Sequence, residues 1–353
     1  MSDIGDSNSQ HIPLLLQDRL TKLKNVSYKN IIKEFIQEYN SKTYNSINEE
    51  YLIIYKYLEK ISESLFKDKI TLIIKKNMDV SSFQIIIDEE EKERFIHPFQ
   101  NFLLGTIIID SFYCKYVKWI SRDALNTENE VEKIWFLTSL FHDLGKPYNT
   151  ILGSDEDNPE VSIRFKNYTK YISFLSSFYE FVKKGNKYQK WNKDVTLRNH
   201  SFEKVLNNYY DSNNHGVIGC FLMFKDLEII YKDESYTPLF MQALWGISIH
   251  DKFVYIELLK EKLLPINIEH FPIYCLLLYC DAIQEWNRKV KISERTELSN
   301  IVIGTKVNFE VIFQSSEDSV KKLQEIDCIN KCISPQNEIE FWFTQQTKVT
   351  ETQ

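Results

Sequence analysis

The feature that most constrains the fold is the recurrence of apolar residues about every 3.6 positions, the period of an α-helix. Ile134, Leu137 and Phe141 form one such series, and a second series runs from Val217 to Tyr231. A helix with this pattern buries one face against its neighbours. We therefore expect the chain from Arg94 to about Lys291 to be mostly helical.

The 353 residues suffice for one large core with an appendage or for two domains. Segments such as "EEYLIIYKYLEKISESLF" predict amphipathic helices in the N-terminal region. The acidic run "DEEEKE" (88–93) follows them and is interpreted as a helix start or a loop, or less simply as a partner surface. The final segments "IVIGTKVNFEVIF", "SVKKLQEIDCIN" and "EIEFWFT" predict strand, helix and strand. The expected parts are a disordered tail (1–12), an N-terminal helical region (13–90), a helical domain (91–297) with an insertion at about 150–200, and a small α+β unit (298–353).

Composition narrows the class of protein. A formal net charge of −7 argues against binding nucleic acid through bulk charge. The lysine-rich segment 183–193 could make a local nucleic-acid contact, but a solvated loop explains it as well. The N-terminus lacks a signal-peptide pattern, and the run "FPIYCLLLYC" is too short to span a bilayer. The six cysteines form no CxxC pair, so we expect a cytoplasmic protein with reduced thiols and no membrane contact.

The histidines are few enough to be judged one by one. Pro98 suits the first turn of a helix, which would leave His97 at the N-terminal edge. His142 and Asp143 would close the next helix, and Gly145 would terminate it by adopting a left-handed backbone. Each histidine alone is more simply a cap or a core residue, so only their joint order suggests a site. That order continues with two more histidines, one opening a helix and one ending a helix: His215 and His250.

Asp281 lies inside the apolar segment "IYCLLLYCDAIQEW". A carboxylate in the middle of such a helix would be buried, and burial of an isolated charge is unfavourable unless a positive partner faces it. Metal ions held between helices would provide that partner.

Together, these residues resemble the HD superfamily of metal-dependent phosphohydrolases over roughly residues 91–290. The resemblance includes "HDLGK" at 142–146, an "R-x-x-H" start at Arg94–His97, two later histidines and "CDAIQEWNR", in which Asn287 stands where relatives have glycine. It implies a mainly α protein: an HD-domain helical bundle with an N-terminal helical region and a small C-terminal α+β appendage.

The resemblance also implies the ligands of two divalent metal ions, whose identity among Mn, Fe, Ni, Co, Zn and Mg is not predicted. One ion would be held by His97, His142, Asp143 and Asp281; the other by His215 and His250, with Asp143 bridging the two. In this chain Asn214 stands where many relatives have aspartate, and Asp251 where some have a second histidine. Two ions about 4 Å apart would lower the pKa of a bridging water and clamp the attacking and leaving oxygens of a phosphate ester.

In relatives the lysine of this motif neutralises a phosphate oxygen, so Asp143 and Lys146 are the expected catalytic residues. Lys146 could instead face solvent at a helix C-terminus. Arg94 and Arg288 are further substrate-binding candidates, or structural ion-pair residues. The remaining histidines have no place in the pattern: His11, His200 and His270.

Three functions remain open on the sequence. The first is hydrolysis of a phosphate ester or phosphodiester, with a small-molecule nucleotide or cyclic nucleotide as substrate. The second is a mixed-valent di-iron oxygenase, because some HD-fold proteins with the same ligand order have that activity. The third is a nucleotide-sensing regulatory or interaction module. The sequence does not predict an oligomeric state.

Overall fold

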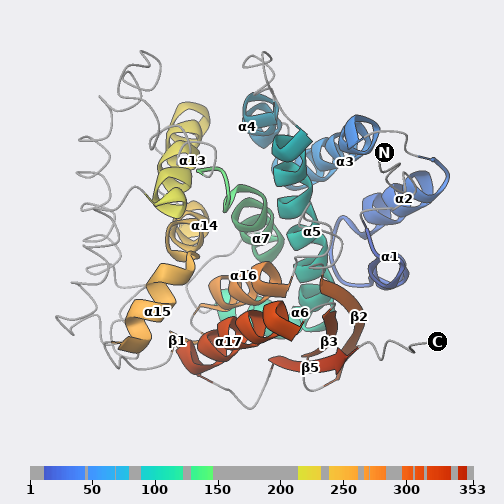
Figure 1. Ribbon diagram of the computed structural model, residues 1–353. Coiled ribbons are helices and arrows are strands. Elements are labelled where there is room, and N and C mark those ends of the chain that lie inside the picture. Colours follow the sequence, from blue (N-terminus) through green and yellow to red (C-terminus); the bar gives the residue numbers. More distant parts are fainter. Residues whose placement is uncertain are drawn as a thin grey trace.

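The protein is mainly helical in a computed structural model, with a small β-sheet near its C-terminal end (Figure 1). The expected fold class is confirmed at this level. Within the described part of the chain, no helix is both long and apolar enough to cross a membrane. The structure describes residues 12–43, 47–67, 69–78, 89–121, 129–145, 214–231, 238–260, 266–269, 271–283, 296–304, 307–313, 316–334 and 341–347.

The N-terminal region contains the amphipathic helices that its sequence predicts. In α2, for example, Ile32, Phe35 and Ile36 all point into the core. Ile12, the last residue of the expected tail, is also buried, and the rest of that tail lies outside the described residues. The helices are α1 (Leu14–Thr21), α2 (Lys29–Asn40), α3 (Ile47–Phe66) and α4 (Lys69–Met78).

Helix α5 (Glu89–Ser111) is central to the fold and packs against α1, α3, α6 (Tyr113–Ser121), α7 (Glu130–Phe141) and α16 (Pro272–Ile283). Pro98 lies inside α5, so the prediction that it begins a helix with His97 at its edge is wrong. Proline lacks an N–H, so α5 lacks one backbone hydrogen bond here. The helix nevertheless continues on both sides of Pro98, so His97 lies inside α5.

Helices α5 and α7 cross where Gly105 meets Trp135. A Cβ on Gly105 would lie 2.0 Å from the Trp135 ring, so only glycine allows this approach. The indole N–H donates to the Phe102 carbonyl at 3.0 Å. This contact fixes the packing of the two helices, which run antiparallel.

The remaining helices complete the bundle (Figure 1). The apolar series predicted from the sequence is confirmed in α7, where Ile134, Leu137 and Phe141 are buried. In α13, Val217 is buried and Tyr231 packs half-buried against the core. These helices are α13 (His215–Tyr231), α14 (Pro238–Ile249), α15 (Lys252–Lys260) and the already introduced α16.

The C-terminal segments form strands and a helix, with one difference from the expectation. The first segment is an antiparallel pair, β2 (Thr296–Ile303) and β3 (Val307–Phe313), rather than a single strand. Strand β5 (Phe341–Thr347) adds to β3 in parallel. Helix α17 (Ser316–Cys332) packs against α15 and α16, and the short strands β1 (Ile266–Asn267) and β4 (Ile333–Ser334) also pair in parallel.

Two buried carboxylates tie the loop between α1 and α2 to the central helices. Asp110, on α5, is 7% exposed and accepts the backbone N–H groups of Lys24, Asn25 and Val26 at 2.5–3.0 Å. The Asn25 amide also donates to the Asp110 carbonyl at 2.6 Å. Backbone N–H groups thus replace the water that this carboxylate loses on burial.

Glu132, near the start of α7, is the second of these carboxylates and is fully buried. It accepts hydrogen bonds from the backbone N–H and hydroxyl of Ser27, and from Tyr113 at 3.1 Å. Burial raises the pKa of Glu132, although these hydrogen bonds act in the opposite direction. One short loop is therefore anchored to both α5 and α7.

Replacing Asp110 should destabilise the fold. We expect Asp110→Ala to lower the free energy of unfolding by about 3 kcal/mol, because it removes the acceptor of three backbone N–H groups, one of them on the buried Val26. Asp110→Asn should cost less, since one acceptor oxygen remains. Urea titration followed by circular dichroism measures both. The control is Asp18→Ala, which removes an exposed pair with Lys22; equal effects at both positions would contradict the anchoring role.

Candidate metal centre

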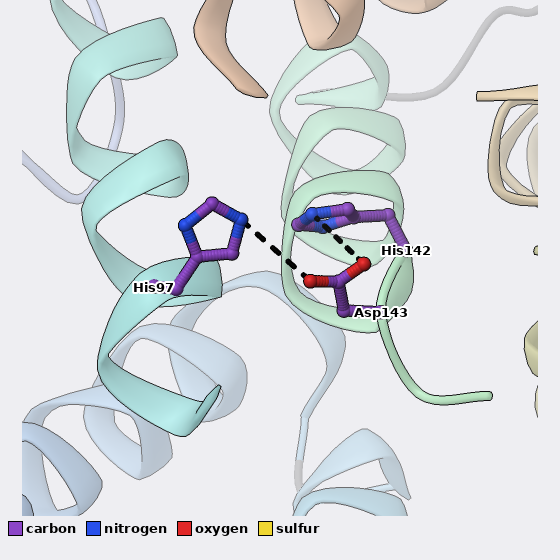
Figure 2. Close-up of side chains that lie close together, drawn as sticks. All are labelled: His97, His142 and Asp143. Carbon is purple, nitrogen blue, oxygen red and sulfur yellow. Dashed lines mark ion pairs between the residues drawn. The ribbon is translucent and has the colours of Figure 1, made fainter. Parts of the chain in front are cut away.

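Six residues predicted from the sequence converge at one place in the helical bundle, and three of them are drawn in Figure 2. Their positions at helix ends largely follow the sequence expectation: His215 opens α13 and His250 directly follows α14. They are contributed by α5 (His97), the turn after α7 (His142, Asp143), α13 (His215), the end of α14 (His250) and the last turn of α16 (Asp281).

Gly145 brings two of these elements together, although not through the left-handed backbone that we expected. No described glycine has a positive φ, so that prediction is wrong. Instead, a Cβ on Gly145 would lie 1.9 Å from the carbonyl oxygen of His215 and 2.8 Å from the backbone nitrogen of Gly219. The absence of a side chain is what lets the turn after α7 touch the start of α13.

On one side of the cluster, His97 and His142 face Asp281. The Nε2 atom of His97 lies 2.8 Å from Asp281 Oδ1, and Nε2 of His142 lies 3.4 Å from the same oxygen. The Nε2 atom of His97 is also 3.6 Å from Oδ2 of Asp143 (Figure 2). These four residues are the set expected around the first ion.

On the other side, the second oxygen of Asp143 faces three imidazoles. Asp143 Oδ1 lies 3.6 Å from Nε2 of His142, of His215 and of His250. Oδ2 of Asp143 thus faces His97, whereas Oδ1 faces His142, His215 and His250. A carboxylate whose two oxygens have different neighbours could bridge two ions, and His142, from the set expected around the first ion, lies beside the oxygen that faces the second pair.

Backbone carbonyls fix the tautomers of two imidazoles. Nδ1 of His142 lies 2.7 Å from the Ser139 carbonyl, and Nδ1 of His250 lies 2.7 Å from the Ile247 carbonyl. Since a carbonyl oxygen only accepts, each Nδ1 must carry the proton. In neutral His142 and His250, Nε2 therefore presents a lone pair to the cluster.

His215 is oriented by a carboxylate instead. Its Nδ1 lies 3.4 Å from Oδ2 of Asp251. The other oxygen of Asp251, Oδ1, caps α15 by accepting the N–H of Phe253 at 2.7 Å. Nε2 of His215 then lies only 3.0 Å from Nε2 of His250. Two lone pairs at this distance repel each other unless a proton or a metal ion lies between them.

Asp281 is less buried than its apolar helix suggested, because its side chain is 28% exposed in the last turn of α16. Removal from water would raise the pKa of Asp281, but hydrogen bonds and charge from His142 and His97 hold that pKa well below its usual range. The expected positive partner is thus supplied in part by the imidazoles themselves.

The donor set fits a metal centre. Ligand atoms bound to one ion at 2.0–2.2 Å lie about 3.0–3.5 Å apart, close to the spacings found here. Three overlapping groups of potential ligands are present: His97, His142 and Asp143; His142, His250 and Asp281; Asp143, His215 and His250. Comparisons of the chain with protein-family models, curated proteins and solved structures found no match, so this interpretation depends on the donor chemistry.

Sequence reasoning missed the roles of Asn101 and Asp251. Asn101 is fully buried and approaches three of the six residues. Its only sequence signal is a spacing of four from His97, which places both on one face of α5. Asp251 was noted as a departure from relatives, but nothing in the sequence showed that it would contact His215.

The expected substrate contacts cannot be placed in the same way. Lys146 and Arg288 lie outside the described residues, as do the lysine-rich segment 183–193, the insertion at 150–200, His11, His200 and His270. Arg94 lies on α5, one turn before His97, and its side chain is not among those described. Their proposed roles remain predictions.

Gly145→Ala should disturb the His215 half of the cluster. The added methyl meets backbone atoms of α13, so the turn after α7 must move away from His215. We expect binding of Mn²⁺ at that half to weaken about 10-fold or more, in line with the effect of misplacing a ligand. Metal content after dialysis and competition with a chromophoric chelator measure this change.

Gly304→Ala is the matched control for that variant, because a Cβ on Gly304 meets nothing within 4 Å. It should bind Mn²⁺ as the wild-type protein does. Unchanged binding in Gly145→Ala would show that the close approach does not position His215.

Proposed function

We propose that this protein is a metal-dependent phosphohydrolase of the HD type, acting in the cytoplasm on a phosphate ester or phosphodiester through two divalent cations. Residues 91–297 would form its HD domain. The observation that carries the proposal is the position of Asp143, whose Oδ2 faces His97 while its Oδ1 faces His142, His215 and His250. Two ions would use both of these oxygens.

The charge balance of the site supports a phosphate substrate. The six residues include only two carboxylates, Asp143 and Asp281, alongside four imidazoles that bind metals in neutral form. With two divalent cations the site keeps a net positive charge, which favours an anionic ester. When bound, the ions supply Lewis acidity, which acidifies water and stabilises charge developing on phosphate oxygens.

Backbone and side-chain groups of the protein would hold and orient this centre. Ser139 and Ile247 carbonyls keep His142 and His250 in the tautomer with Nε2 available, and Asp251 does the same for His215. Lys146, next to the turn that carries Asp143, would bind a non-bridging phosphate oxygen. In hydrolysis a water oxygen bonds to phosphorus, and the ester oxygen leaves with a proton.

A nucleotide or cyclic nucleotide as substrate rests on the resemblance to HD phosphohydrolases. The same ligand set occurs with di-iron oxygen chemistry, and a sensing module would share it as well. The three functions therefore predict different results in the same experiment.

Protein purified without chelators should contain two divalent ions and release phosphate or a nucleotide product. We expect activity within a panel of phosphomonoesters, nucleotides and cyclic dinucleotides assayed under Mn²⁺ and Ni²⁺. Asp143→Ala should lower kcat/KM at least about 100-fold, the loss typical of removing one electrostatic stabiliser from an active site. It should also reduce metal content more than His142→Ala does, because the two oxygens of Asp143 together face all four imidazoles.

Asp327→Ala, which removes an exposed carboxylate paired with Lys331, is the control and should leave metal content and activity unchanged. Two irons with a mixed-valent spectroscopic signal and no phosphate release would point to oxygen chemistry instead. A biological activity that survives loss of metal in Asp143→Ala would indicate a sensing role.

A further inference from the structure

Asn101 stands out among the buried polar residues that the proposed function does not use. It lies on α5 one turn after His97 and has no exposed surface. Its Nδ2 atom is 3.3 Å from Asp281 Oδ1, 3.4 Å from His97 Nε2 and 3.5 Å from His142 Nε2. The end of its amide therefore points at the three residues expected around the first ion with Asp143.

Nothing in the surrounding helices explains an amide at this position. Asparagine is a poor helix former compared with leucine or alanine. Burying an amide is unfavourable unless its groups are hydrogen-bonded, and Asn101 Oδ1 has no hydrogen-bond partner among the described residues. An apolar side chain would satisfy the helix and the core better, so the amide needs a reason connected with the cluster.

The orientation of the amide places its NH₂ group beside Asp281 Oδ1, which also lies 2.8 Å from Nε2 of His97. Without an ion, an NH₂ group donates favourably toward imidazole lone pairs and carboxylate oxygens. A cation in the same place reverses the preference, because it attracts the carbonyl dipole and repels the NH₂ hydrogens. Rotation about the last side-chain bond exchanges these two groups within nearly the same volume.

We infer that Asn101 is a further ligand of the ion held by His97, His142 and Asp281, binding it through Oδ1. Nδ2 lies 3.3–3.5 Å from an atom of each of these residues, the spacing that ligands of a common ion have, and the rotation brings Oδ1 to that position. The inference rests on the proposed metal centre and not on its substrate. It also makes the two positions more unlike, because the first ion would have three residues with oxygen ligands, Asp143, Asp281 and Asn101, where the His215–His250 side has only Asp143, and this favours Mn²⁺ or Mg²⁺ at the first position.

The test compares Mn²⁺ binding by purified full-length wild type, Asn101→Leu and Asn101→Asp, measured by competition with a chromophoric chelator. Asn101→Leu keeps the volume but removes the oxygen, so we expect one Mn²⁺ to bind about 10- to 100-fold more weakly. Asn101→Asp offers a charged oxygen at the same place and should bind that ion at least as tightly as wild type. Asn101→Ala also removes the oxygen without adding bulk, so it should weaken the binding of the same Mn²⁺ as Asn101→Leu does.

Thr106→Val is the matched control, since it removes a buried hydrogen bond to Tyr28 farther along α5. It should leave Mn²⁺ binding unchanged even where it lowers thermal stability. Unchanged binding in both Asn101→Leu and Asn101→Ala would overturn the inference, because the amide would then only fill space. Equal weakening in Asn101→Asp and Asn101→Leu would also overturn it, since it would show that the NH₂ group matters.

These outcomes are separate from the failure of the proposed function. If the Asn101 variants behave as expected but no phosphate ester is cleaved, the ligand role stands and the hydrolase proposal falls. If phosphate is released while Asn101→Leu binds Mn²⁺ like wild type, the hydrolase proposal stands and the ligand role of Asn101 falls. A wild-type protein that binds no Mn²⁺ overturns both.

Discussion

The organisation of this protein depends on keeping two carboxylates and four imidazole nitrogens together where water is largely excluded. Lone pairs and negative charge at such short range repel one another, and a low-dielectric interior strengthens that repulsion. Rigid packing must therefore hold the groups in place. The apolar helices α5, α7, α14 and α16 provide it, with fully buried side chains such as Trp135 and Phe102 directly between the ligand-bearing elements.

The sequence predicted the parts of this arrangement that depend on periodicity and on residue chemistry. Apolar spacing identified the helices, and the order of histidines and aspartates identified the six residues that converge. It did not predict local backbone geometry. Pro98 usually signals a helix start, but tertiary packing keeps it inside α5, and Gly145 allows close approach where a left-handed terminus was expected.

Asn101 shows a second kind of limit. A single asparagine in a helix carries no periodic signal, and only the positions of His97, His142 and Asp281 around it reveal its surroundings. The β2–β3 pair was missed for a related reason. Its two strands have similar patterns of residues, so in the sequence only the turn near Gly304 separates them. Contacts between distant segments therefore decide the details that composition and spacing leave open.

The loop between α1 and α2 is connected through α5 and α7 to the candidate metal centre, which lies some distance away. Asp110 lies 13 residues beyond His97 on α5, about 20 Å along the helix. Glu132 lies ten residues before His142 on the neighbouring helix, about 15 Å away. The loop thus joins α5 and α7 at the ends opposite their ligands. Ions at the other end would hold the same two helices together there, so that α5 and α7 would be tied at both ends, on either side of their crossing at Gly105 and Trp135.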